Sequence, residues 1–92
     1  MMDSSDEDGV ILALIARFEK QRLPRLRMLK GQVENGDLLT DGDIEFLDGV
    51  IHDAQQSKRL MDRHPEWHAF CAEVVHLYES ITERALQNEQ GL

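Results

Sequence analysis

Hydrophobic residues recur at helical spacing along nearly the whole chain, and no segment shows the sustained alternation of a strand. Four segments carry the pattern, at about residues 6–22, 24–35, 41–61 and 65–89. In each, apolar side chains fall three or four positions apart and form one stripe. The stripes are Ile11, Leu14, Ile15 and Phe18; Leu26, Leu29 and Val33; Ile44, Leu47, Ile51, Ala54 and Met61; and Trp67, Phe70, Cys71, Val74, Leu77, Tyr78, Ile81 and Ala85.

The breaks between these segments predict how the helices are arranged. Pro24 follows the first segment, and its ring excludes the carbonyl of the residue four positions earlier, so the helix must break or kink there. Short connections place consecutive helices antiparallel. We therefore predict an all-α fold, a small bundle of three to four antiparallel helices whose first arm is kinked at Pro24. Residues 1–92 form a single domain, with residues 1–5 as a disordered acidic N-terminus.

The clearest local signal is the start of the third segment. Thr40 is predicted to cap the helix by accepting from the backbone N–H of Asp43, and Asp43 is a shorter equivalent of the glutamate of a capping box. Leu39 and Ile44 occupy the two positions of a hydrophobic staple. Gly36, just before, suits the left-handed conformation that ends the preceding helix.

Composition narrows the function classes. The formal charge is −8, from 18 acidic and 10 basic residues, which argues against nucleic acid and anionic membranes as partners. No apolar run approaches the ~18–20 residues of a membrane span. A single cysteine, Cys71, excludes an intrachain disulfide and fits a reducing compartment, so we expect a cytoplasmic protein.

The charges are arranged in blocks. Six basic residues surround Pro24, namely Arg17, Lys20, Arg22, Arg25, Arg27 and Lys30, with Glu19 as the only acid among them. Residues 34–53 then carry seven acids and no base. Such blocks either hold solvated faces or face each other across the fold, and a local nucleic-acid surface is the less favoured alternative.

One loop resembles an EF-hand calcium loop. In residues 37–48, Asp37 falls at its first position, Asp41 at the fifth, Gly42 at the sixth and Asp48 at the twelfth. Leu39 occupies the third ligand position, where calcium needs an oxygen. This alternative also requires the regular helix to begin only near Glu45, whereas the capping pattern explains the same residues without an ion.

Two further groups have residue types that bind transition metals. His64, His68 and Cys71 stand at spacings that place them near one another at the start of the fourth helix, and zinc accepts imidazole and thiolate. Glu73 and His76 form a single Glu-x-x-His pair of the kind used in di-iron bundles, where two such pairs are required. A buried structural cysteine and surface histidines are the favoured interpretations. We therefore predict no cofactor and no metal, with these five residues as the candidates for a metal-binding alternative.

The chain shows no arrangement of a nucleophile with a base, and its six glycines are scattered and do not form a phosphate loop. We therefore expect a protein that is not an enzyme. Residues 10–16 are apolar on all sides of a helix, although a surface helix normally has a polar face. A second buried face explains this, so we predict protein–protein association, most simply a homodimer. The alternative is that this helix is the central element of the bundle. The predicted interface residues are Val10, Leu12, Ile15 and Phe46, with Leu12 at the centre.

Overall fold

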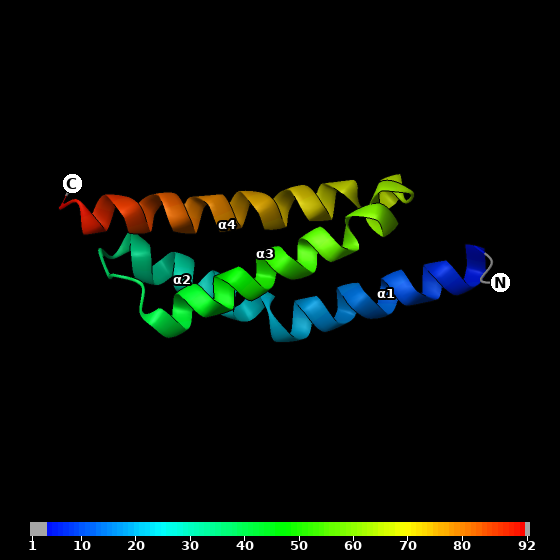
Figure 1. Cartoon of the computed structure of the whole chain (residues 1–92), viewed down its shortest axis with the longest axis horizontal. Helices are drawn as coiled ribbons and strands as arrows, with labels where there is room; N and C mark the ends of the chain where they lie inside the picture. Colours follow the sequence, from blue (N-terminus) through cyan, green and yellow to red (C-terminus); the bar gives the residue numbers. More distant parts are fainter. Residues whose placement is uncertain (1–3, 92) are drawn as a thin grey trace.

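The computed structural model describes residues 4–91 and is built of helices. They are α1 (Ser4–Gln21), α2 (Leu23–Glu34), α3 (Asp41–Asp62), the short 3-10 helix η1 (Pro65–Trp67) and α4 (His68–Glu89). The arm formed by α1 and α2 runs in the same direction as α4, and α3 runs in the opposite direction (Figure 1). No strand occurs within residues 4–91. The predicted all-α bundle is therefore confirmed.

The first arm is interrupted at Arg22, next to the predicted break. Helical hydrogen bonding nearly continues through it, because the Arg22 N–H donates to the Phe18 carbonyl at 2.8 Å and the Leu26 N–H to the Arg22 carbonyl at 3.0 Å. Pro24 lies in the first turn of α2, where its missing N–H breaks no intrahelical bond. The start of α1 differs from the expectation for residues 1–5. Ser4 and Ser5 are already helical, and residues 1–3 lie outside the described part of the chain.

The core lies at the α2 end of the molecule. It joins three residues of α2, three of α3 and two of α4: Leu26, Leu29, Val33, Phe46, Leu47, Val50, Ile81 and Ala85. The predicted stripe of α2 is confirmed, but that of α3 is rotated, since Phe46 and Val50 are buried while Ile44 remains 44% exposed. Phe46 is covered by two guanidinium groups, Arg25 at 4.4 Å and Arg22 at 5.6 Å from the ring centroid.

The turn between α2 and α3 is held from both sides. Gly36 has a φ of +93°, and its N–H donates to the Val33 carbonyl while the Asp37 N–H donates to the Gln32 carbonyl. This is the Schellman arrangement that the sequence pattern indicated at Gly36. Asn88 of α4 also binds here, because its amide donates to the carbonyls of Val33 at 2.8 Å and Asp37 at 3.0 Å.

The molecule is elongated, with extents of 53 × 20 × 17 Å and a radius of gyration of 15.1 Å. A compact domain of this length has a radius of gyration of about 12 Å. At the α2 end α2 packs closely against α4, but at the other end α1 makes few close backbone approaches to α3 and α4. This end therefore leaves apolar side chains of three helices facing a gap that they do not fill.

Candidate functional site

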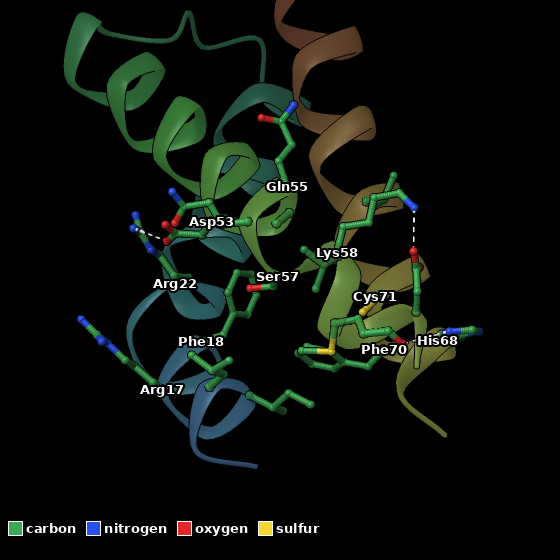
Figure 2. Close-up of a pocket in the computed structure, with 18 of the residues that line it drawn as sticks. Arg17, Phe18, Arg22, Asp53, Gln55, Ser57, Lys58, His68, Phe70 and Cys71 are labelled. Carbon is green, nitrogen blue, oxygen red and sulfur yellow. Dashed lines mark hydrogen bonds and ion pairs between the residues drawn. The ribbon is translucent and has the colours of Figure 1, made fainter. Parts of the chain in front are cut away.

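A groove of about 760 Å³ opens between α1, the second half of α3 and the first half of α4. Figure 2 shows Phe18, Ser57, Phe70 and Cys71 directed into it from the three helices. Its apolar lining comprises Leu14, Ile15, Phe18, Ala54, Met61, Phe70, Cys71, Val74 and Val75. The groove is therefore mainly apolar, and it belongs to the end of the bundle where the core is incomplete.

Aromatic side chains form the floor of this groove. The rings of Phe18 and Phe70 meet edge to face with centroids 6.0 Å apart, and Trp67 packs on Phe70 in the same way at 6.5 Å. Edge-to-face contacts of this kind fix ring positions. Phe18 and Phe70 thus connect α1 to α4 beneath the opening and hold the two apolar walls apart.

One side of α1 forms a wall of the groove and extends past it toward the start of the helix. Val10, Leu14, Arg17 and Gln21 follow one another at spacings of four, three and four residues, which places them on one side of the helix. Leu14, Arg17 and Gln21 line the groove. Val10 is 40% exposed and Leu14 38%, and across the opening Val75 of α4 is 43% exposed. Val10, Leu14 and Val75 thus form a strip of exposed apolar side chains on and beside the two walls of the groove.

Charged residues border the opening and are mostly paired within the chain. Arg22 Nη2 lies 2.8 Å from Asp53 Oδ2, and Lys58 Nζ lies 2.8 Å from Asp62 Oδ2. Arg25 pairs with Asp43 at 3.3 Å, deeper in the α2–α3 interface. The basic block around Pro24 thus faces the acidic block of α3, as one of the two interpretations of the sequence predicted. Arg17 has a side-chain bond to Gln21 and borders the groove.

The four predicted interface residues fall into two groups. Val10 and Leu12 are exposed, Leu12 by 55%. Ile15 and Phe46 are buried within the chain, which differs from the exposed position expected of interface residues. Ile15 is 5% exposed because it faces into the bundle, and Phe46 is 9% exposed beneath the two arginines. Leu12 itself lies about 160° around α1 from Leu14, away from the groove.

The predicted zinc residues do not converge. His68 Nε2 lies 3.1 Å from the Met61 carbonyl and borders the groove. Cys71 lines the groove too, and burial, with a smaller effect of the Asp62 charge, raises the pKa of its thiol. His64 instead turns toward α1 and contacts carboxylates. Glu73 and His76 are both exposed on α4. Apart from His64, none of these residues belongs to a group of three neighbouring metal ligands within the described side chains.

The calcium-loop alternative is contradicted by the start of α3. Helix begins at Asp41, and the Thr40 side chain accepts from the Asp43 N–H while the Asp43 carboxylate accepts from the Thr40 N–H. The predicted cap is confirmed. Because residues 41–48 are already helical, Asp41 and Asp48 lie on a rigid rod and cannot wrap around one ion with Asp37.

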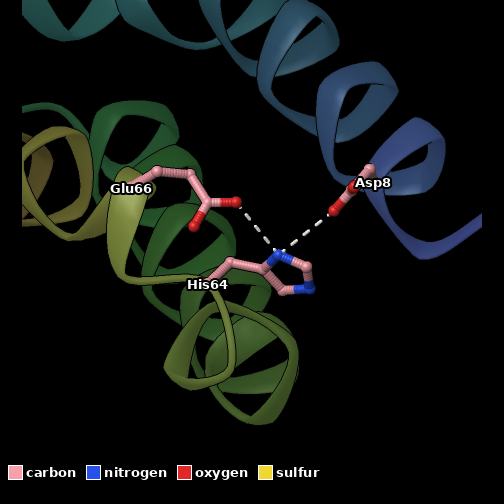
Figure 3. A group of neighbouring side chains, drawn as sticks. All are labelled: Asp8, His64 and Glu66. Carbon is pink, nitrogen blue, oxygen red and sulfur yellow. Dashed lines mark hydrogen bonds and ion pairs between the residues drawn. The ribbon is translucent and has the colours of Figure 1, made fainter. Parts of the chain in front are cut away.

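A different group of metal-binding residue types meets at the far end of α1 (Figure 3). His64 Nδ1 lies 3.1 Å from Glu66 Oε1 and 3.3 Å from Asp8 Oδ1. The other ring nitrogen, Nε2, lies 3.7 Å from Glu7 Oε1, and Glu7 is also bound by Arg63. Arg63 lowers the pKa of Glu7, and the backbone N–H of Glu66 followed by His64 lowers the pKa of Glu66. Both carboxyl groups are thus ionised at neutral pH.

Sequence reasoning identified His64 but missed Asp8 and Glu66. Asp8 lies far from His64 in the sequence, and only the packing of α1 against the corner between α3 and η1 brings them together. Glu66 is two residues from His64, so a His-x-Glu spacing was the only local signal.

None of the helices in residues 4–91 combines the length and the apolar character needed to cross a membrane. Comparisons of the chain with models of protein families, with curated proteins and with solved structures find no match.

Proposed function

We propose that this is a non-catalytic helical protein that acts by protein association, and that its partner is a second copy of the same chain. The observation that carries the proposal is the incomplete end of the bundle, where the groove and the exposed strip of Val10, Leu14 and Val75 lie side by side. Two copies cover these surfaces when their α1 helices pack against each other along the groove.

The exposed area supports an association of this size. The chain exposes 6492 Å², about 1,000 Å² more than the surface expected for a compact monomer of its mass. A stable dimer of ordinary size buries about 800 Å² per partner. The extra exposed surface of this chain is therefore large enough for a partner to cover the groove and the adjoining strip on α1 and α4.

The charges of α1 favour a second copy in an antiparallel orientation. The helix is acidic at its beginning, with Asp6, Glu7 and Asp8, and has a net positive charge toward its end, where Arg17 and Lys20 flank Glu19. A two-fold axis near the middle of α1 places the basic end of each copy beside the acidic end of the other. A parallel pair would bring like charges together, which costs binding energy. The uneven distribution of charge along α1 thus makes the helix of one copy complementary to that of the other in the antiparallel orientation.

A non-catalytic role agrees with the chemistry of the groove. Its thiol, Cys71, has a raised pKa and is therefore protonated at neutral pH, which makes it a poor nucleophile. The free thiol also suits the cytoplasm, where we place the protein.

Light scattering coupled to size exclusion tests the proposal on the full chain. We expect a dimer at about 100 µM, a concentration that detects any interface stronger than about −5.5 kcal/mol. Leu14→Glu should give a folded monomer, because it places a charge in the middle of the contact. Leu12→Glu is the matched control, since the same change on the opposite side of α1 should leave the dimer intact.

The outcomes separate three arrangements. A wild-type monomer at this concentration would overturn self-association and leave the groove to a different protein. A dimer broken by Leu12→Glu but not by Leu14→Glu or Val75→Glu would place the interface on the outer side of α1. Arg17→Glu should weaken the dimer if the antiparallel charge pairing is correct, and an unchanged dissociation constant would contradict that orientation.

A further inference from the structure

We propose that Asp8, His64 and Glu66 bind a divalent transition-metal ion such as Zn²⁺, which fastens the beginning of α1 to the corner between α3 and η1. The three side chains come from α1, from the residue that precedes η1, and from η1 itself, and they point toward one another (Figure 3). The site does not require self-association, because all three ligands come from one chain.

The spacing of the ligand atoms fits one small ion. All three candidate atoms lie within 4.8 Å of one another. His64 Nδ1 is 3.3 Å from Asp8 Oδ1 and 3.1 Å from Glu66 Oε1. Two ligands of a tetrahedral zinc ion, each bonded at about 2.0–2.1 Å, are separated by about 3.4 Å. The group therefore requires only small side-chain adjustments to surround the ion.

The second nitrogen of His64 faces a carboxylate, as the outer nitrogen of a metal-binding imidazole often does. When Nδ1 binds the ion, Nε2 carries the proton, and in metal sites this N–H characteristically faces a carboxylate. Glu7 Oε1 lies 3.7 Å from Nε2 and is held by Arg63, whose Nε donates to it at 2.9 Å. His64 is 8% exposed, so its ring is fixed by packing. This outer carboxylate distinguishes the group from a chance cluster of surface acids.

Charge favours an ion at the same point. Asp8 and Glu66 both approach one ring nitrogen, and a neutral imidazole has a single N–H there to share between them. Within residues 7–91, neither carboxylate forms an ion pair with a lysine or an arginine. A divalent cation between them would neutralise both charges. Imidazole with carboxylates suits zinc, whereas calcium takes oxygen ligands in larger number.

Calorimetric titration of the chelator-treated full chain with ZnCl₂ at neutral pH tests the proposal. We expect one ion per chain and a rise in the melting temperature with zinc concentration. Asp8→Asn and Glu66→Gln should each weaken zinc binding at least tenfold. Both side chains are more than half exposed, so these variants should fold normally, which cannot be assumed for a change at buried His64. Glu7→Gln should also weaken binding, by about tenfold, through the outer contact.

Matched controls identify where zinc binds. Glu73→Gln changes an exposed glutamate of α4, and Cys71→Ser removes the only thiol, so both should bind zinc as the wild type does. Calcium should give no saturable heat. The proposal would be overturned if the wild type gave no saturable zinc isotherm, or if Asp8→Asn and Glu66→Gln bound zinc as tightly as the wild type. The three side chains would then simply form ion pairs around His64. Binding abolished by Cys71→Ser would overturn it as well, and would move the ion to the groove.

Discussion

At the scale of single residues, the start of α3 shows how two side chains define a helix end. The Asp43 N–H donates to the Thr40 hydroxyl at 3.1 Å, and the Thr40 N–H donates to the Asp43 carboxylate at 3.0 Å. The Thr40 backbone N–H is the main cause of a lowered pKa at Asp43, and Arg25 adds to it. Asp43 therefore caps the start of α3 and also pairs with Arg25, the arginine that lies over the Phe46 ring.

Thr40→Ala should lower the free energy of unfolding by about 1 kcal/mol, the usual cost of losing a cap that satisfies a backbone N–H. Thr82→Ala is the matched control, because its hydroxyl bonds only to carbonyls one turn back within α4 and alanine is the better helix former. Urea denaturation followed by circular dichroism measures both. An equal loss in the two variants would mean that the effect does not come from the cap.

The residues predicted correctly from the sequence are those whose partners are nearby in the chain. Thr40 and Asp43, and Gly36 with the last turn of α2, act over three to five positions, so local chemistry determines them. Asp8 and Leu12 show the opposite case. Their surroundings depend on how α1 lies against helices that follow much later, and a helical stripe does not specify the direction that each side of α1 faces.

At the scale of elements, α2 is short and depends on its ends and on its neighbours. It packs most extensively against α4. In its last turn the Val33 carbonyl accepts from the Gly36 N–H, from the Asn88 amide and from Arg84 Nε at 3.4 Å. Its two glycine positions, Gly31 inside the helix and Gly36 just beyond it, have different backbone requirements.

Gly31→Ala should stabilise the protein by about 0.5–1 kcal/mol, because nothing lies within 4 Å of the added methyl group and alanine loses less backbone freedom in a helix. Gly36→Ala should destabilise it by about 1–2 kcal/mol, since its φ of +93° disfavours any residue with a side chain. Thermal or urea denaturation measures both changes. Stabilisation by Gly36→Ala would show that the Schellman turn is not maintained in solution.

The rotation of α3 shows why the core of an element was only partly predictable. Ile44 and Phe46 lie on different sides of the helix, and hydrophobic spacing alone allows either side to face inward. Arginines of the first arm reach across and cover the Phe46 ring, and Gly49 gives Arg22 room, since a Cβ there would lie 3.3 Å from Arg22 Nη1. This cation–π contact between segments was not visible as a pattern in either one.

At the scale of the whole molecule, the two ends differ in how completely they are packed. Eight buried residues join α2, α3 and α4 at one end. At the other end α1 is attached through buried Ile11 and Ile15, the contact of Phe18 with Phe70, and the ion pairs of its first turns with Arg63 and His64. The elongated shape follows from long helices that lie side by side, with α1 and α2 end to end in one arm (Figure 1). α3 and α4 close a core with α2 at one end, and at the other end they leave the groove open between themselves and α1.

Hydrogen exchange should therefore divide the chain in two. Amides of α2 and of the second half of α4 should exchange slowly, because their opening requires loss of the core, while those of α1 should exchange faster through local opening. Mass spectrometry of the exchanged protein locates the slowly and the rapidly exchanging segments.

Raising the protein concentration should slow exchange in the middle of α1 and around Val75, whereas adding zinc should slow it at the beginning of α1 and in η1. Uniform exchange in all four helices would contradict the division, and a concentration effect retained in Leu14→Glu would place the contact between copies outside the groove.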